Sequence, residues 1–164
     1  MIMYREVGEP KSLTSSATNG HVNSGGLNFK NDPTYEKRDK IAKLYYDNMR
    51  TSGREGFVKN IARNSGMKEK GIEKIFEHIF IKKHNLRDGF RYFDPSYDMA
   101  ESFRRLMEGN NIQPHDLILL KHEWLELGLM KRYGYDYDTA HNITKRKYDY
   151  DAALNKWLKE RGDW

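Results

Sequence analysis

Apolar residues recur at helical spacing along most of the chain. In the stretch 68–84, Ile72, Ile75 and Ile79 follow one another at intervals of three and four residues. This spacing places apolar side chains on one face of an α-helix. Similar patterns, bounded by Gly, Pro, Ser or Asp, predict helices over seven segments: 34–50, 54–64, 68–84, 96–108, 117–130, 137–148 and 151–161.

Two segments depart from the helical pattern. Residues 1–31 are rich in Gly, Ser, Thr and Asn, so we expect a flexible arm or linker there, followed by one domain at 32–164. Residues 86–94 contain Asp88-Gly89, which is typical of a tight turn, and allow one short β-hairpin. The predicted fold class is mainly α, a compact bundle of five to seven helices.

The composition excludes several kinds of protein. The chain has 164 residues, enough for one domain, and no cysteine, which rules out disulfides, thiolate zinc sites and cysteine nucleophiles. No run of about 20 apolar residues occurs, so we expect no membrane-spanning segment. The first residues also lack the apolar core of a signal peptide. Export would therefore need a fused delivery protein or a non-classical route.

Positive charge is concentrated in one part of the chain. The net charge is +5, but residues 37–91 alone carry 15 Lys and Arg against 7 Asp and Glu. A concentrated basic face suits the phosphate backbone of RNA or an acidic protein partner. The structural alternative is an ordinary solvated helical surface.

The most apolar segment, 117–130, also contains ionisable residues. His122 and Glu126 are four residues apart and share one helix face, with Glu123 about 100° around the helix. We expect this helix to be the most buried, and burying such groups is costly unless they are paired, hydrated or bound to something. This cost favours a functional site, with a structural network around a buried Tyr as the alternative.

Other histidines lie where they could join this site. His141 belongs to the next helix, and a tight turn between two helices makes them antiparallel neighbours, so His141 could face the polar residues of 117–130. His78 lies near the edge of the apolar face of its helix, and His84 is expected at the end of that helix. His115 follows a proline and is expected to be exposed at the start of its helix.

Two chemistries fit these residues, and the first is metal-independent cleavage of RNA. In this reaction the neighbouring 2′-hydroxyl attacks, two imidazoles act as general base and acid, and a cation stabilises the charge on phosphorus. The candidate catalytic residues are His122, His141, Glu126, Glu123, His84 and Arg91. The candidate substrate-binding residues are Lys121, Arg105 and Arg87. No cofactor is needed for this reaction.

The second chemistry uses a divalent metal such as zinc, which binds a water molecule and activates it. The candidate ligands are His122, Glu126, and His141 or His78. Glu123 would then act as the base. The string HEWLE resembles the zinc-protease pattern HExxH but has Glu in place of the second His, which argues against an ordinary protease of that type.

The stretch from Ile75 to Tyr150 resembles a known class of proteins. Its blocks EHIFIKKHNL, RYFDPSYDMAESFRRL, PHDLILLKHEWLELGLM and YDTAHNITKRKYDY are similar to C-terminal toxin modules of bacterial polymorphic, contact-dependent and LXG-type toxins. The resemblance implies an effector domain that is secreted as part of a longer delivery protein, acts in the cytoplasm of a target cell and is neutralised by a cognate, acidic immunity protein. Expressed alone, it would stay in the cytoplasm. Most such small basic modules are nucleases.

Three functional hypotheses follow. The first is a toxin that cleaves RNA, with tRNA as one candidate substrate. The second is a metal-dependent hydrolase of another substrate, and the third is a non-catalytic module that binds nucleic acid or protein. Metal content separates the first two hypotheses, and salt-dependent RNA binding without cleavage favours the third.

Overall fold

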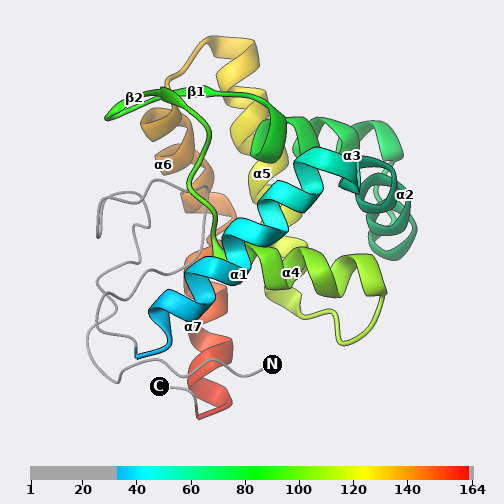
Figure 1. Ribbon diagram of the computed structural model, residues 1–164. Coiled ribbons are helices and arrows are strands. Elements are labelled where there is room, and N and C mark those ends of the chain that lie inside the picture. Colours follow the sequence, from blue (N-terminus) through cyan, green and yellow to red (C-terminus); the bar gives the residue numbers. More distant parts are fainter. Residues whose placement is uncertain (1–32, 163–164) are drawn as a thin grey trace.

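The fold is mainly helical in the computed structural model, which describes residues 33–162 (Figure 1). The predicted fold class is therefore confirmed, and the expected arm at 1–31 lies outside the described residues. The elements in chain order are α1 (Tyr35–Asn48), the π-helical segment η3 (Met49–Gly53), α2 (Arg54–Ser65), α3 (Glu69–Phe76), the π-helical segment η4 (Glu77–Ile81), β1 (His84–Leu86), β2 (Gly89–Arg91), α4 (Tyr97–Glu108), α5 (Pro114–Tyr133), α6 (Tyr137–Lys147) and α7 (Tyr150–Glu160).

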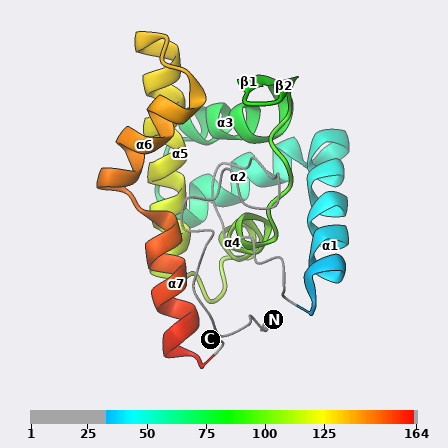
Figure 2. The same cartoon turned by 90° about the vertical axis from the view of Figure 1, so that its left-hand side faces the viewer.

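The helices pack in layers. Figure 2 shows α5, α6 and α7 on one side, α1 on the opposite side, and α2, α3 and α4 between them. The middle of this packing is aromatic: Phe57 contacts Phe76, Phe80 and Phe103 with ring centroids 5.1–5.5 Å apart. Edge-to-face contacts of this kind add to the stability that apolar burial provides. Within residues 33–162, no helix is long and apolar enough to cross a bilayer.

Local sequence signals explain where the helices begin and end. Gly66, Gly109 and Gly134 follow the last residues of α2, α4 and α5 with φ of 78°, 75° and 68°. Glycine adopts this left-handed conformation without steric cost, which ends the helix. The side chains of Ser96 and Asp136 accept hydrogen bonds from backbone N–H groups in the first turns of α4 and α6.

The predicted helix 68–84 ends earlier than expected. It runs as α3 and then η4 to Ile81, and the N–H of Lys82 donates to the carbonyl of Glu77 over 2.8 Å, which closes a wide π turn. His84 is therefore the first residue of β1 rather than the end of a helix. His78 lies in this π turn.

The predicted hairpin is present, with its turn displaced by one residue. His84 pairs with Arg91 and Leu86 pairs with Gly89, so the two residues of the turn are Arg87 and Asp88. Gly89 has φ of 137°, and its conformational freedom allows the chain to enter β2 directly.

The most buried helix is α4, not the segment 117–130 as expected. Eight of the twelve residues of α4 are buried, whereas no residue from 127 to 133 is buried. The reason is visible in Figures 1 and 2: α4 lies between other helices, while the end of α5 extends past the bundle alongside α6.

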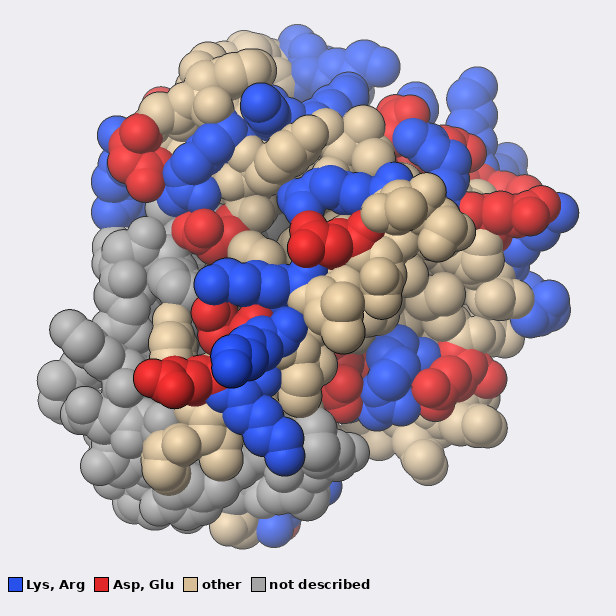
Figure 3. Space-filling view, in the orientation of Figure 1, with Lys and Arg blue, Asp and Glu red and all other residues tan. Residues whose placement is uncertain are grey.

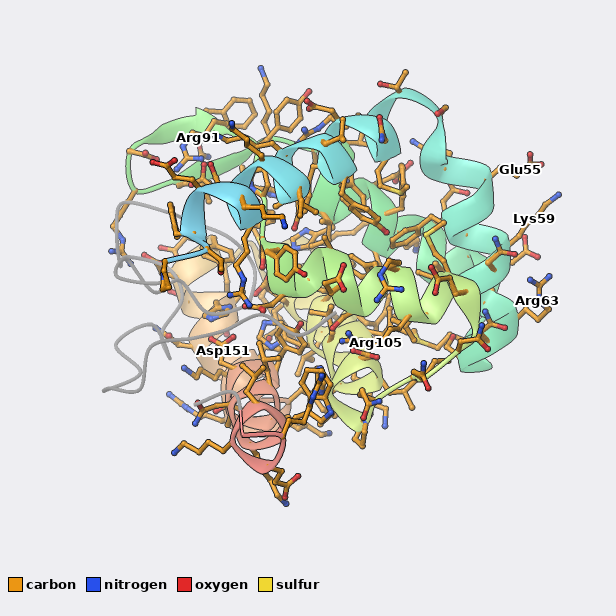
Figure 4. The ribbon with its side chains drawn as sticks, turned by 60° about the horizontal axis from the view of Figure 1, so that its bottom comes forward. Glu55, Lys59, Arg63, Arg91, Arg105 and Asp151 are labelled. Carbon is orange, nitrogen blue, oxygen red and sulfur yellow. The ribbon has the colours of Figure 1, made fainter. Side chains whose placement is uncertain are left out.

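A buried polar network joins α4 to the start of α5. Arg105, expected to bind substrate, lies in the core and donates two hydrogen bonds of 2.8 Å to the carboxylate of Asp116 (Figure 4). His115, expected to be exposed, is 1% exposed, and Arg105 donates to its Nε2 over 3.2 Å. In the first turn of α5, His115 and Asp116 are buried because α7 packs against them, with the ring of Trp157 4.8 Å from that of His115.

The buried His115 predicts a loss of stability in acid. Burial lowers its pKa to about 4, with Arg105 adding to this and Asp116 opposing it. Between about pH 6.5 and pH 4 the unfolded chain binds a proton that the folded protein does not bind. The free energy of unfolding should therefore fall over this interval, by up to about 3 kcal/mol from this residue. Urea unfolding across the interval measures the decrease.

The variant His115→Gln keeps an acceptor for Arg105 but removes the titration. Its stability should depend less steeply on pH than that of the wild type over the same interval. Equal slopes in the two proteins would show that His115 does not contribute to the acid sensitivity.

Candidate metal centre

Three imidazoles and two carboxylates meet where α5, α6 and η4 converge. Glu126 of α5 is at the centre of this group, with Glu123 on the same helix. His122 comes from the preceding turn of α5, His141 from α6 and His78 from η4. We call these five residues the His/Glu cluster. The sequence-based expectation that His122 and His141 lie together, close to both glutamates, agrees with this geometry.

One oxygen of Glu126 contacts two imidazoles. Its Oε2 atom lies 3.1 Å from Nε2 of His122 and 2.9 Å from Nδ1 of His141, and these two nitrogens are 3.3 Å apart. The three atoms thus form a nearly equilateral triangle. In a tetrahedral zinc site, metal–ligand bonds of about 2.0–2.2 Å place neighbouring ligand atoms about 3.3 Å apart. The triangle therefore has the dimensions of one face of such a site.

The other oxygen of Glu126 faces a second group of ligands. Its Oε1 atom lies 3.0 Å from Nε2 of His78, which is also 3.8 Å from Oε1 of Glu123. Ligand atoms of these three residues lie within 4.8 Å of one another. Glu126 is thus shared by two sets of possible metal ligands.

Hydrogen bonding fixes how His122 is protonated. Its Nδ1–H donates to the backbone carbonyl of Tyr148 over 2.8 Å, so the neutral imidazole has its lone pair on Nε2, facing Glu126. Burial lowers the pKa of His122, but the hydrogen bond and charge of Glu126 outweigh this effect and raise the pKa to about 9. Without a cation, His122 is an imidazolium that donates from both nitrogens.

The pKa of Glu126 depends on the same contacts. Burial raises the pKa of its carboxyl group, but the hydrogen bonds from His122, His141 and His78 hold it well below its ordinary range. Glu126 is therefore ionised, as a metal ligand must be.

Aromatic contacts hold His78 and His84 in place. Phe93 stacks on His84 with ring centroids 4.4 Å apart and packs edge-on against His78. His84 donates from Nε2 to the backbone carbonyl of His78 over 2.8 Å, and burial lowers the pKa of His84 to about 4, with the neighbouring His78 adding to this. Residues behind metal ligands commonly orient them in this way.

The cluster is buried. None of its five residues exposes more than 4% of its surface. Ionised carboxylates that are buried together are costly unless cations compensate them, and without a metal the His122 imidazolium compensates one of the two. In addition, Nε2 of His141 has no hydrogen-bond partner within the described part of the chain. Both features are expected of a site that is completed by a ligand.

The remaining predicted site residues lie outside the cluster. Arg91 forms ion pairs with Asp88 and Asp94 at the hairpin, and Arg87 lies 3.5 Å from Asp138 with half of its side chain exposed. Lys121 is exposed on α5, next to His122 in the chain. His84 is close to the cluster, but as a support for His78.

The surface seen in Figure 3 has mixed charge. Lys and Arg side chains alternate with Asp and Glu over this face. On α1, Lys43 forms an ion pair with Asp39. Figure 4 shows Glu55, Lys59 and Arg63 projecting outward from α2, where Lys59 pairs with Glu55. The excess positive charge of residues 37–91 is therefore not a single uniform patch on the face in view.

Sequence reasoning missed three groups that shape the cluster. The carbonyl of Tyr148 orients His122, the ring of Phe93 packs on His84 and His78, and Tyr137 has its hydroxyl 3.4 Å from Nδ1 of His141. Only Tyr137 left a signal in the sequence, because it precedes His141 by four residues on one helix face.

No protein-family model matches the chain, and no curated protein or solved structure is significantly similar to it.

Proposed function

We propose that this protein is a metal-dependent hydrolase whose catalytic cation is bound by His122, Glu126 and His141. The observation that carries the proposal is the triangle of ligand atoms with edges of 2.9, 3.1 and 3.3 Å. A divalent cation with three protein ligands keeps a position for water and lowers the pKa of that water to about 7. The protein then provides a hydroxide nucleophile at neutral pH.

The same distances give less support to metal-independent acid–base catalysis. A general base and a general acid must act on opposite sides of the reacting phosphate, so the substrate has to fit between the two imidazoles. The nitrogens of His122 and His141 are 3.3 Å apart and both face one carboxylate oxygen. A cation fits between them, whereas a phosphate group does not.

RNA is the substrate that we propose for this hydrolase, acting as the toxin domain of a larger secreted protein. The support is the basic balance of residues 37–91, together with the resemblance of residues 75–150 to bacterial toxin modules. A metal-bound hydroxide can attack a phosphodiester without a 2′-hydroxyl, so DNA is a second substrate to test. An acidic immunity protein is the partner that this role implies.

A purely structural metal is the second candidate, and the burial of the cluster favours it. Structural zinc sites are closed, whereas catalytic sites keep one open position. A structural cation would join α5, α6 and η4 and would raise the stability of the fold without any reaction.

The test is cleavage of tRNA, other RNA and DNA by protein that has been stripped with a chelator and then supplied with Zn²⁺, Mn²⁺ or Mg²⁺. We expect cleavage only with added metal and its loss in His122→Ala and His141→Ala. The exposed Glu55→Gln is the matched control and should behave as the wild type.

Three other results are possible, and each supports a different conclusion about the metal. Cleavage that persists in chelator but needs His122 would support the metal-independent reaction. A metal that raises the unfolding temperature without any cleavage would support the structural role. Protein that binds none of the three metals would exclude both metal proposals.

A further inference from the structure

The His/Glu cluster contains more ligands than one tetrahedral cation needs. His122, His141 and Oε2 of Glu126 complete one set, which leaves His78, Glu123 and Oε1 of Glu126. These remaining groups are at most 4% exposed. The two Glu126 oxygens are thus divided between two sets of partners, which is how a carboxylate bridges two metal ions.

We propose that the cluster binds two divalent cations bridged by Glu126, the second held by His78 and Glu123. This inference rests on the proposed function and extends it. A bridging carboxylate suits two cations about 3.5–4 Å apart, the separation of two-metal phosphatases and nucleases. Such a pair stabilises both the attacking and the leaving oxygen of a phosphoryl displacement.

A π turn in the backbone positions His78, one ligand of the second cation. His78 lies in the π turn of η4, and π turns inside helices occur frequently at functional sites. Phe93 and His84 then fix its ring from behind, at centroid distances of 5.4 and 4.7 Å. The position of His78 opposite Glu126 is therefore determined by η4, by His84 of β1 and by Phe93 of the loop that follows β2.

Glu123 has a different role in this arrangement from the general base expected from the sequence. Two bound cations would lower the pKa of a bound water molecule, so Glu123 would not be needed as a base. Glu123 is fully buried, and its Oε1 lies 3.8 Å from Nε2 of His78. This distance suits two ligands of the same cation.

The charge of the pair favours an anionic substrate. Two divalent cations bring +4 to a site whose carboxylates supply −2, so +2 remains. An anionic oxygen of the substrate would neutralise part of this charge, and the phosphodiester group of a nucleic acid provides one.

The experiment measures metal stoichiometry by equilibrium dialysis against Mn²⁺ and Zn²⁺, with the full chain and with circular dichroism as a check of folding. We expect two cations per chain in the wild type and in the control Glu55→Gln. His78→Ala and Glu123→Gln should each bind one cation, and His141→Ala should also bind one. Electron paramagnetic resonance of the Mn²⁺ form should show a spin-coupled pair in the wild type and uncoupled Mn²⁺ in His78→Ala.

The outcomes separate this inference from the proposed function. A wild type that binds one cation, lost in His141→Ala and kept in His78→Ala, would overturn the second site and leave the proposed function intact. Two cations that neither His78→Ala nor Glu123→Gln reduces would also overturn it, because the second ion would then bind elsewhere. No binding at all would remove both proposals. If one variant fails to fold, the other variant of the same set and the spin coupling decide.

Discussion

Glu126→Gln is expected to abolish metal binding and to lower metal-dependent cleavage by about 10³-fold or more. The amide is close in size to the carboxylate but cannot supply anionic oxygen to a cation. Because a metal acting as Lewis acid contributes several kcal/mol of transition-state stabilisation, and each 1.36 kcal/mol is a factor of ten, losing it has this order of magnitude. Initial rates with saturating metal, together with dialysis, measure both effects.

Thermal unfolding provides a second readout for the same substitution. A metal at about 100 times its dissociation constant stabilises the wild type by about 2.7 kcal/mol. Glu126→Gln should unfold at the same temperature with and without metal, whereas Glu55→Gln should show the wild-type shift. A Glu126→Gln protein that cleaves at the wild-type rate and still gains stability from metal would show that Glu126 is not a ligand.

The sequence was sufficient to predict the part of the site that lies on neighbouring helices. His122 and Glu126 share a face because they are four residues apart, and His141 follows on the next antiparallel helix. These relations depend on helix periodicity and a short turn, both of which are local. From these two relations the sequence predicts that the three residues of the 2.9–3.3 Å triangle lie close together.

The other half of the site depends on contacts between distant segments. His78 is 48 residues from Glu126 in the chain, and its direction is set by a π turn that apolar periodicity does not reveal. His84 was expected at a helix end because nothing in the local pattern marks Ile81 as the last helical residue. That Glu126 contacts two separate sets of possible ligands could therefore be recognised only from the structure.

A similar limit explains why Arg105 and His115 were misplaced. Arg105 was expected to bind substrate, and His115 was expected to be exposed because it follows a proline at the start of a helix, but both are buried. Their burial follows from Asp116, which lies in the first turn of α5 and pairs with Arg105 across the junction with α4. Asp116 also accepts a hydrogen bond of 2.8 Å from the backbone N–H of Gln113, so one carboxylate caps α5 and neutralises the buried cation.

Arg105→Met is expected to lower the free energy of unfolding by about 3–5 kcal/mol, since it leaves the buried Asp116 without its cation. Asp116 is 0% exposed and Arg105 8% exposed, so solvent does not screen the pair. The adjacent Arg104→Met is the matched control. Arg104 pairs with Glu101 and Glu108 with its side chain 37% exposed, and its loss should cost about 0–1 kcal/mol. Urea unfolding at neutral pH measures both variants.

The double variant Arg105→Met with Asp116→Asn tests the cause of that loss. Asparagine removes the uncompensated charge, and its side-chain oxygen can still accept the N–H of Gln113 at the start of α5. The double variant should therefore be more stable than Arg105→Met alone, even though it contains one more substitution, because the penalty for an unpaired buried charge exceeds the net contribution of the pair. If the two substitutions instead destabilise additively, the loss in Arg105→Met comes from packing against Trp157, whose ring lies 5.3 Å from the guanidinium, and not from the charge left on Asp116.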